Sequence, residues 1–124
     1  MKLIQSTKNP ELKQLRLLFE KARERKKKKL FVIEGEREIK KAILSDYSFT
    51  QVFMEDGSAP VEPEVQTLAL HTPAFRVERK AFERISKRSG SEKIMAVAQI
   101  KSHELGDLTL TDQALVLVIE APEK

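Results

Sequence analysis

The chain has 124 residues, of which 40% are hydrophobic and 34% charged, and its formal net charge is +4. This balance is too apolar for a disordered chain and too charged for a membrane protein, and no apolar run approaches the roughly 20 residues of a membrane-spanning helix. With no cysteine and only two histidines, the sequence excludes a disulfide scaffold, thiolate chemistry and a multi-histidine metal site, and it fits a cytoplasmic location.

The first predicted helix begins at Pro10, with Asn9 as its N-cap. Its apolar residues recur at helical spacing and are Leu12, Leu15, Leu18, Phe19 and Ala22. A basic run over residues 21–29 follows, with seven Lys or Arg and one Glu, and it either continues this helix or frays from its end. Residues 55–66, in contrast, contain four acids and no Lys or Arg, so the net charge understates the local basic character.

Short apolar runs alternate with helical stripes along the rest of the chain. The runs predict strands over residues 30–33, 49–54, 74–77 and 94–100. The stripes predict helices over residues 36–43, 63–70 and 78–85, and residues 86–93 are expected to form a polar loop. The alternation favours a three-layer α/β/α sandwich with a mostly parallel sheet covered on both faces.

The last segment has a different pattern. Residues 101–111 form a polar connection, and residues 114–119 are a fully apolar run that predicts a strand buried on both faces. A chain that ends five residues later cannot cover both faces of that strand. We therefore expect a fragment, with a first domain over residues 1–100, a linker over 101–111 and the start of a second α/β domain over 112–124. The alternative is an edge strand that completes the first sheet.

Several short motifs occur in a recognisable order. Ile4–Pro10 contains Ser-x-x-Asn-Pro, Lys21–Arg23 is Lys-x-Arg, and Leu30–Gly35 contains Phe-x-x-Glu-Gly. Two apolar strands follow, Ile94–Val97 and Leu115–Glu120. In order and spacing these stretches resemble SpoU/TrmH-type RNA ribose 2'-O-methyltransferases, specifically the N-terminal substrate-binding domain and the first strand of the catalytic domain. One departure is the Ser-Glu-Lys of residues 91–93, where the family often has Pro-Gln-Gly.

The resemblance implies a fold for this chain and a different function for each of the two domains of the family. The N-terminal domain would be a sandwich similar to the ribosomal proteins that bind kink-turn RNA. A C-terminal trefoil-knot domain, absent here, would bind S-adenosylmethionine and form a homodimer. The catalytic and cofactor motifs of the family would lie beyond Lys124, so no catalytic, cofactor-binding or metal-binding residue is assigned. The chain alone is expected to be inactive.

Clustered cations are the candidate RNA contacts, because each neutralised phosphate releases a counterion. Within the basic run, Arg23 and Arg25 can grip a phosphate in two places or stack on an unpaired base, unless one of them pairs with a nearby glutamate. Two further cations follow the end of the strand over residues 30–33, where α/β sheets often build sites. The candidate residues are Lys13, Arg23, Arg25, Lys26, Lys27, Lys28, Lys29, Arg37 and Lys40.

Three functions remain open from the sequence. The leading one is the RNA substrate-binding part of an S-adenosylmethionine-dependent methyltransferase acting on rRNA or tRNA ribose. The second is a stand-alone, non-enzymatic RNA-binding module of the kink-turn-binding ribosomal class. The third is a protein-interaction domain whose lysines only increase solubility. The salt dependence of RNA binding separates the third from the first two.

Overall fold

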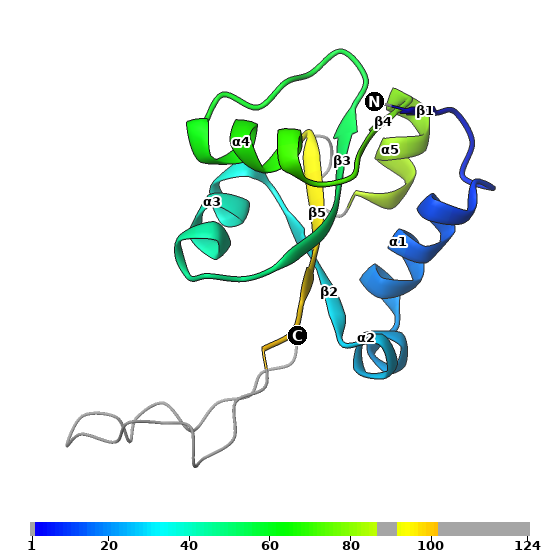
Figure 1. The fold of residues 1–124 in the computed structure, drawn as a ribbon. Coiled ribbons are helices and arrows are strands. Elements are labelled where there is room, and N and C mark those ends of the chain that lie inside the picture. Colours follow the sequence, from blue (N-terminus) through cyan, green and yellow to red (C-terminus); the bar gives the residue numbers. More distant parts are fainter. Residues whose placement is uncertain (1, 87–91, 102–124) are drawn as a thin grey trace.

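Five strands form one sheet in the order β1-β4-β3-β5-β2 in the computed structural model, which describes residues 2–86 and 92–101 (Figure 1). The strands are β1 (Lys2–Ile4), β2 (Leu30–Glu34), β3 (Phe49–Glu55), β4 (Ala74–Val77) and β5 (Ile94–Gln99). The helices are α1 (Pro10–Glu20), α2 (Ala22–Lys28), α3 (Glu36–Leu44), α4 (Pro63–His71) and α5 (Arg79–Ile85).

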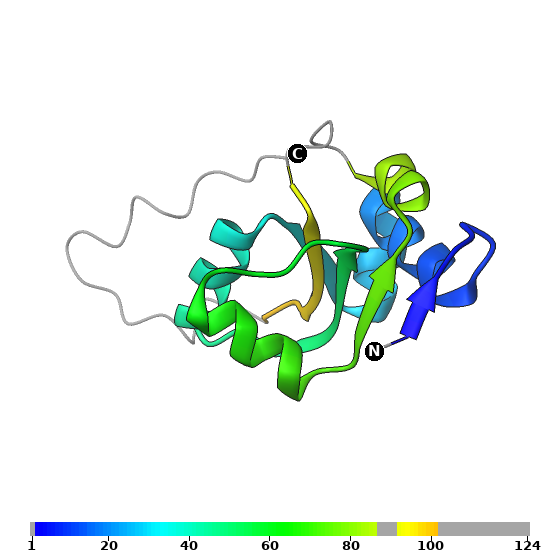
Figure 2. The ribbon, with the colours of Figure 1, turned by 90° about the horizontal axis from the view of Figure 1, so that it is seen from above.

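The helices cover both faces of the sheet, which confirms the predicted three-layer sandwich. Helices α3 and α4 lie on one face and α1, α2 and α5 on the other (Figure 2). Each face has its own apolar core. Leu18 and Phe82 pack with Phe53 on the α1 and α5 side, while Ile39 and Val65 pack with Val52 on the α3 and α4 side. Alternate residues of β3 thus serve opposite cores, as the two-residue period of a strand requires.

The predicted mostly parallel pairing is wrong for two of the four strand pairs. β1 pairs with β4 and β3 pairs with β4 in parallel, but β5 is antiparallel to both β3 and β2. Four strands therefore point in one direction and only β5 opposes them. As a result, the carboxyl ends of β2, β3 and β4 still meet at one edge of the sheet.

The chain enters β5 from the carboxyl edge of the sheet, where the Lys93 carbonyl accepts a hydrogen bond from the Glu55 N–H at 2.9 Å. Helix α5 has seven residues, which span about 10 Å, whereas the six residues of β5 span about 20 Å, so the helix by itself does not return the chain to the opposite edge.

The start of the chain agrees with the sequence in one respect and differs in two. Asn9 caps α1 as predicted, its Oδ1 accepting a hydrogen bond from the Glu11 N–H at 2.8 Å. Strand β1 was not predicted, because three residues are too short to show a period. The basic run neither continues α1 nor frays. Lys21 is extended, at φ −117° and ψ 113°, and it separates α1 from a distinct helix α2.

Gly35 connects β2 to α3 with a φ of 105°, a backbone conformation that favours glycine. In the ranges 2–86 and 92–101, no helix is long and apolar enough to cross a membrane. Residues 87–91 and 102–124 lie outside the described residues. The predicted linker beyond its first residue and the predicted strand over 114–119 fall there, and the division into domains stays a prediction.

Candidate nucleic-acid interface

The two helical layers differ in charge. We call α1, α2 and α5 the basic layer, since these helices contain ten Lys or Arg and four Glu, a net charge of +6. We call α3 and α4 the neutral layer, since they contain three Lys or Arg and three Glu. The positive charge of the chain is therefore concentrated on one face of the sandwich.

Helix α2 carries the densest positive charge of the basic layer. It has no buried residue, and its last turn consists of four cations, which suit the negative end of the helix dipole. Lys29 ends the helix in the left-handed conformation, at φ 58°. Among the described residues, the side chains of Arg23, Lys26, Lys27 and Lys29 have no hydrogen-bond or ion-pair partner.

Arg25, unlike Arg23, forms hydrogen bonds within the domain. Its Nη1 donates hydrogen bonds to the carbonyl oxygens of Leu18 at 2.8 Å and Phe19 at 3.1 Å, in the last turn of α1. These carbonyls have no partner within their own helix, so the guanidinium acts as a C-terminal cap. The structure thus uses Arg25 to fix α2 against α1, and it pairs neither arginine with a glutamate.

Lys13 and Lys28 lie on the same layer. Lys28 Nζ lies 3.4 Å from Gln14 Oε1, a long hydrogen bond between α2 and α1. The Lys13 side chain is exposed on α1 and has no described partner, whereas the neighbouring Arg16 pairs with Glu20 at 3.5 Å. The structure therefore brings seven of the nine predicted contacts together on the basic layer.

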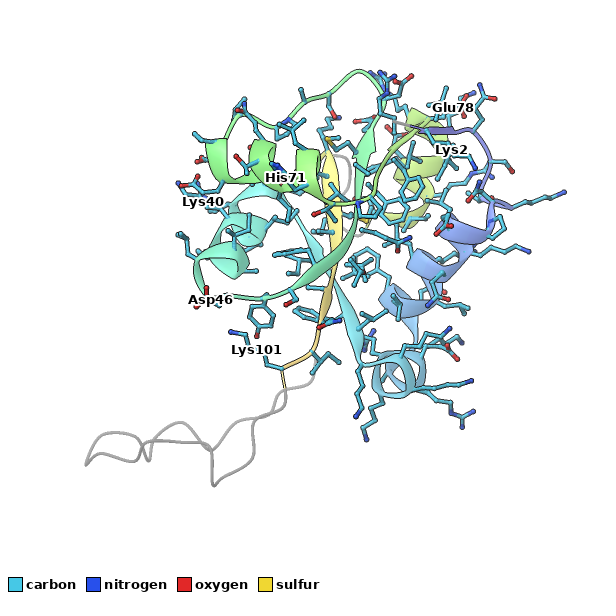
Figure 3. The ribbon with its side chains drawn as sticks, in the orientation of Figure 1. Lys2, Lys40, Asp46, His71, Glu78 and Lys101 are labelled. Carbon is cyan, nitrogen blue, oxygen red and sulfur yellow. The ribbon has the colours of Figure 1, made fainter. Side chains whose placement is uncertain are left out.

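Arg37 and Lys40 fall on the neutral layer, in α3, and are separated from the rest. Lys40 Nζ lies 2.9 Å from a Glu62 carboxylate oxygen and 3.9 Å from one of Glu64 (Figure 3). This hydrogen bond and the two negative charges raise the pKa of Lys40 above its ordinary value. Lys40 thus joins α3 to the start of α4, and its charge is balanced locally. Arg37 is exposed, without a described partner.

The carboxyl edge of the sheet holds two buried acids, neither of which the sequence analysis named as a site residue. Glu34 ends β2, is 7% exposed and accepts a hydrogen bond from the Ser86 hydroxyl. Glu55 ends β3, is 3% exposed and pairs with Arg79 and Lys93. The sequence feature that could have identified both residues is an acid at the end of an otherwise apolar strand. Within the described ranges, no group of three or more potential ligands could hold a metal ion.

Comparison with models of known families shows which family the chain belongs to. Residues 9–96 match the model of the MRM3-like substrate binding domain, which is about seven tenths of the chain. The chain belongs to this family. No curated protein gives a significant match. The MRM3-like domain match confirms the SpoU-type resemblance that the motifs of the sequence suggested.

Solved structures share the fold of this MRM3-like domain. An RNA 2'-O ribose methyltransferase superposes with a TM-score of 0.71 at 28% identity, covering 91% of this chain and 43% of that one. An rRNA methyltransferase from Sinorhizobium meliloti gives 0.70 at 20% identity, covering 86% and 40%. The SpoU methyltransferase AviRb from Streptomyces viridochromogenes, in complex with AdoMet, gives 0.65 at 13% identity, covering 83% and 38%. The chain thus spans about two fifths of these proteins.

Proposed function

We propose that this chain binds the RNA substrate of a SpoU-type ribose 2'-O-methyltransferase, with α2 as its principal contact. The observation that carries the proposal is the set of exposed cations of α2, which have no acidic partner in the described structure. A family description that names a substrate-binding domain supports the same proposal. Similarity to methyltransferase structures favours it over a stand-alone ribosomal-type module.

Cations of this kind contact phosphates and sugars, and they read no sequence. Their contribution is affinity, which falls as salt rises because counterions are released on binding. Arg23 adds a planar guanidinium that can hold one phosphate through two donors. The basic layer would therefore supply affinity and orientation, and base recognition would require other groups.

The finer parts of the proposal concern the longer protein. We propose that it transfers a methyl group from S-adenosylmethionine to a ribose 2'-hydroxyl of rRNA or tRNA, and that it dimerises through its catalytic half. One apolar hollow, lined by Met54, Pro60, Leu70 and Arg76 among others, contains no carboxylate to bind the positively charged methionine part of the cofactor. We assign no catalytic step to this chain.

The test is the salt dependence of RNA binding by the whole chain. The probe is a labelled single-stranded oligouridylate, followed by fluorescence anisotropy between about 50 and 200 mM salt. The variant is Lys26→Gln with Lys27→Gln. Its matched control is Arg37→Gln with Lys41→Gln, which removes two charges from the neutral layer.

Loss of two phosphate contacts lowers the salt slope by about 1.4, at about 0.7 per contact on a single strand. The same relation predicts about 25-fold weaker binding at 0.1 M salt. We expect this loss in the α2 variant and less than a twofold change in the control. Equal losses in both variants would show that position does not matter, and they would favour a non-specific basic protein. A larger loss of RNA affinity in the control variant would place the interface on α3, which contains the predicted RNA contact Arg37.

A further inference from the structure

Glu55 holds two cations from different parts of the chain. Its side chain is 4% exposed. One carboxylate oxygen accepts a hydrogen bond from Lys93 Nζ at 2.9 Å, and the other lies 3.3 Å from Arg79 Nε. Glu55 ends β3, Arg79 begins α5, and Lys93 immediately precedes β5. The three residues therefore meet only in the folded domain.

The cluster has an excess of positive charge on its solvent side. A buried carboxylate is costly unless it is paired, and Glu55 has two cationic partners, while its Oε2 accepts no hydrogen bond among the described residues. Both partners remain accessible, since the Arg79 side chain is 72% exposed and that of Lys93 is 48% exposed. These three residues together carry a net charge of +1, and their two cations can be reached by solvent or a ligand; the neighbouring acids Asp56, Glu78 and Glu92 are not part of the cluster.

The contact geometry leaves donors available for an anion. Arg79 approaches Glu55 through Nε at 3.3 Å, and its guanidinium has four further N–H donors on the terminal nitrogens. Lys93 uses one of its three N–H donors on Glu55. The carboxylate thus fixes two cationic groups beside each other, which is the arrangement that a phosphate prefers. Lys80 and Arg84 extend the positive surface along α5.

We propose that Arg79 and Lys93, held by Glu55, form a second phosphate-binding site for the RNA. This inference rests on the proposed function and extends it. The site lies at the carboxyl edge of the sheet, whereas α2 lies at the opposite end of the same layer (Figure 1). The RNA backbone would run along the basic layer and contact both ends. Glu55 is a positioning residue that does not touch the ligand.

The test uses Arg79→Gln with Lys93→Gln, the same oligouridylate, and the same neutral-layer control. We expect the salt slope to fall by about 1.4 and the affinity at 0.1 M salt by about 25-fold. If the α2 variant loses affinity and this variant does not, the second site is wrong and the proposed function stands. If only this variant loses affinity, the second site stands and α2 is not the contact. If neither loses affinity, both proposals fail.

Two charge-controlled variants test the positioning role. Arg79→Lys keeps the charge but removes the planar fork, and we expect about fivefold weaker binding, which equals one lost contact at 0.1 M salt. Unchanged affinity would overturn the role of the guanidinium. Glu55→Gln and the exposed Glu83→Gln each remove one negative charge. Binding that weakens only in Glu55→Gln, with thermal unfolding confirming a folded protein, supports positioning, whereas stronger binding in both overturns it.

Discussion

The basic layer and the neutral layer have similar interiors and opposite surfaces. Both bury aliphatic and aromatic side chains against the same sheet. Outside, the α2 cations Arg23, Lys26 and Lys27 of the basic layer have no acidic partner among the described residues. The neutral layer pairs Lys40 with two glutamates and exposes Leu70 at 81%. The difference shows that the apolar cores determine the fold and do not by themselves determine which face binds a ligand. What distinguishes the two layers is which surface charges are left unpaired.

The largest effects are expected in the cores, where the two layers are alike. Leu18→Ala and Ile39→Ala each remove a side chain with 0% exposure, one from each layer. We expect each to lower the free energy of unfolding by about 2–5 kcal/mol, measured by urea denaturation. Leu17→Ala and Leu70→Ala, at exposed positions, are the controls and should change it by less than about 0.5 kcal/mol. A two-step transition in either core variant would show that the layers unfold separately.

The next comparison separates folding from binding within α2 itself. Arg25→Ala removes the cap on α1 and should lower the free energy of unfolding by about 1–2 kcal/mol. Arg23→Ala removes an exposed side chain and should leave stability within about 0.5 kcal/mol while weakening RNA binding about fivefold at 0.1 M salt. Urea denaturation measures the stability of both variants, and fluorescence anisotropy measures their RNA affinity. The same stability loss in both variants would contradict the capping role.

The smallest effect concerns the ion pair of the neutral layer. Because the partners of Lys40 raise its pKa, the pair stabilises the fold below the unfolded lysine value of about 10.4. That contribution disappears as pH rises through the higher folded pKa. We expect the wild type to lose more stability above about pH 10 than Glu62→Gln, in thermal unfolding followed across the alkaline range. Identical pH profiles would show that the contact has no energetic role.

Local patterns were sufficient for most elements. The stripe containing Leu12, Leu15 and Leu18 predicted α1, and Asn9 correctly marked its N-cap. Three features escaped the sequence prediction. Strand β1 and the direction of β5 depend on partner strands far along the chain, and α2 separates from α1 at Lys21. None of these leaves a periodic signal in its own residues.

The candidate interface shows the same limit. The basic run identified the α2 cations, since charge density is a property of consecutive residues. The sequence could not separate Arg25, which caps a helix, from Arg23, which faces solvent. The sequence also could not predict the ion pairs of Glu55 with Arg79 and Lys93, because these partners lie 24 and 38 positions further along the chain.

The sequence by itself determined the α/β class, most helices and strands, the SpoU-type resemblance and the position of the densest charge. These follow from periodicity and composition, which are local. Only the tertiary structure decided which cations are neutralised, which hold the fold together and which share a face. Those outcomes depend on distances between residues far apart in the chain, because an ion pair or a buried carboxylate exists only once the sheet has brought its members together.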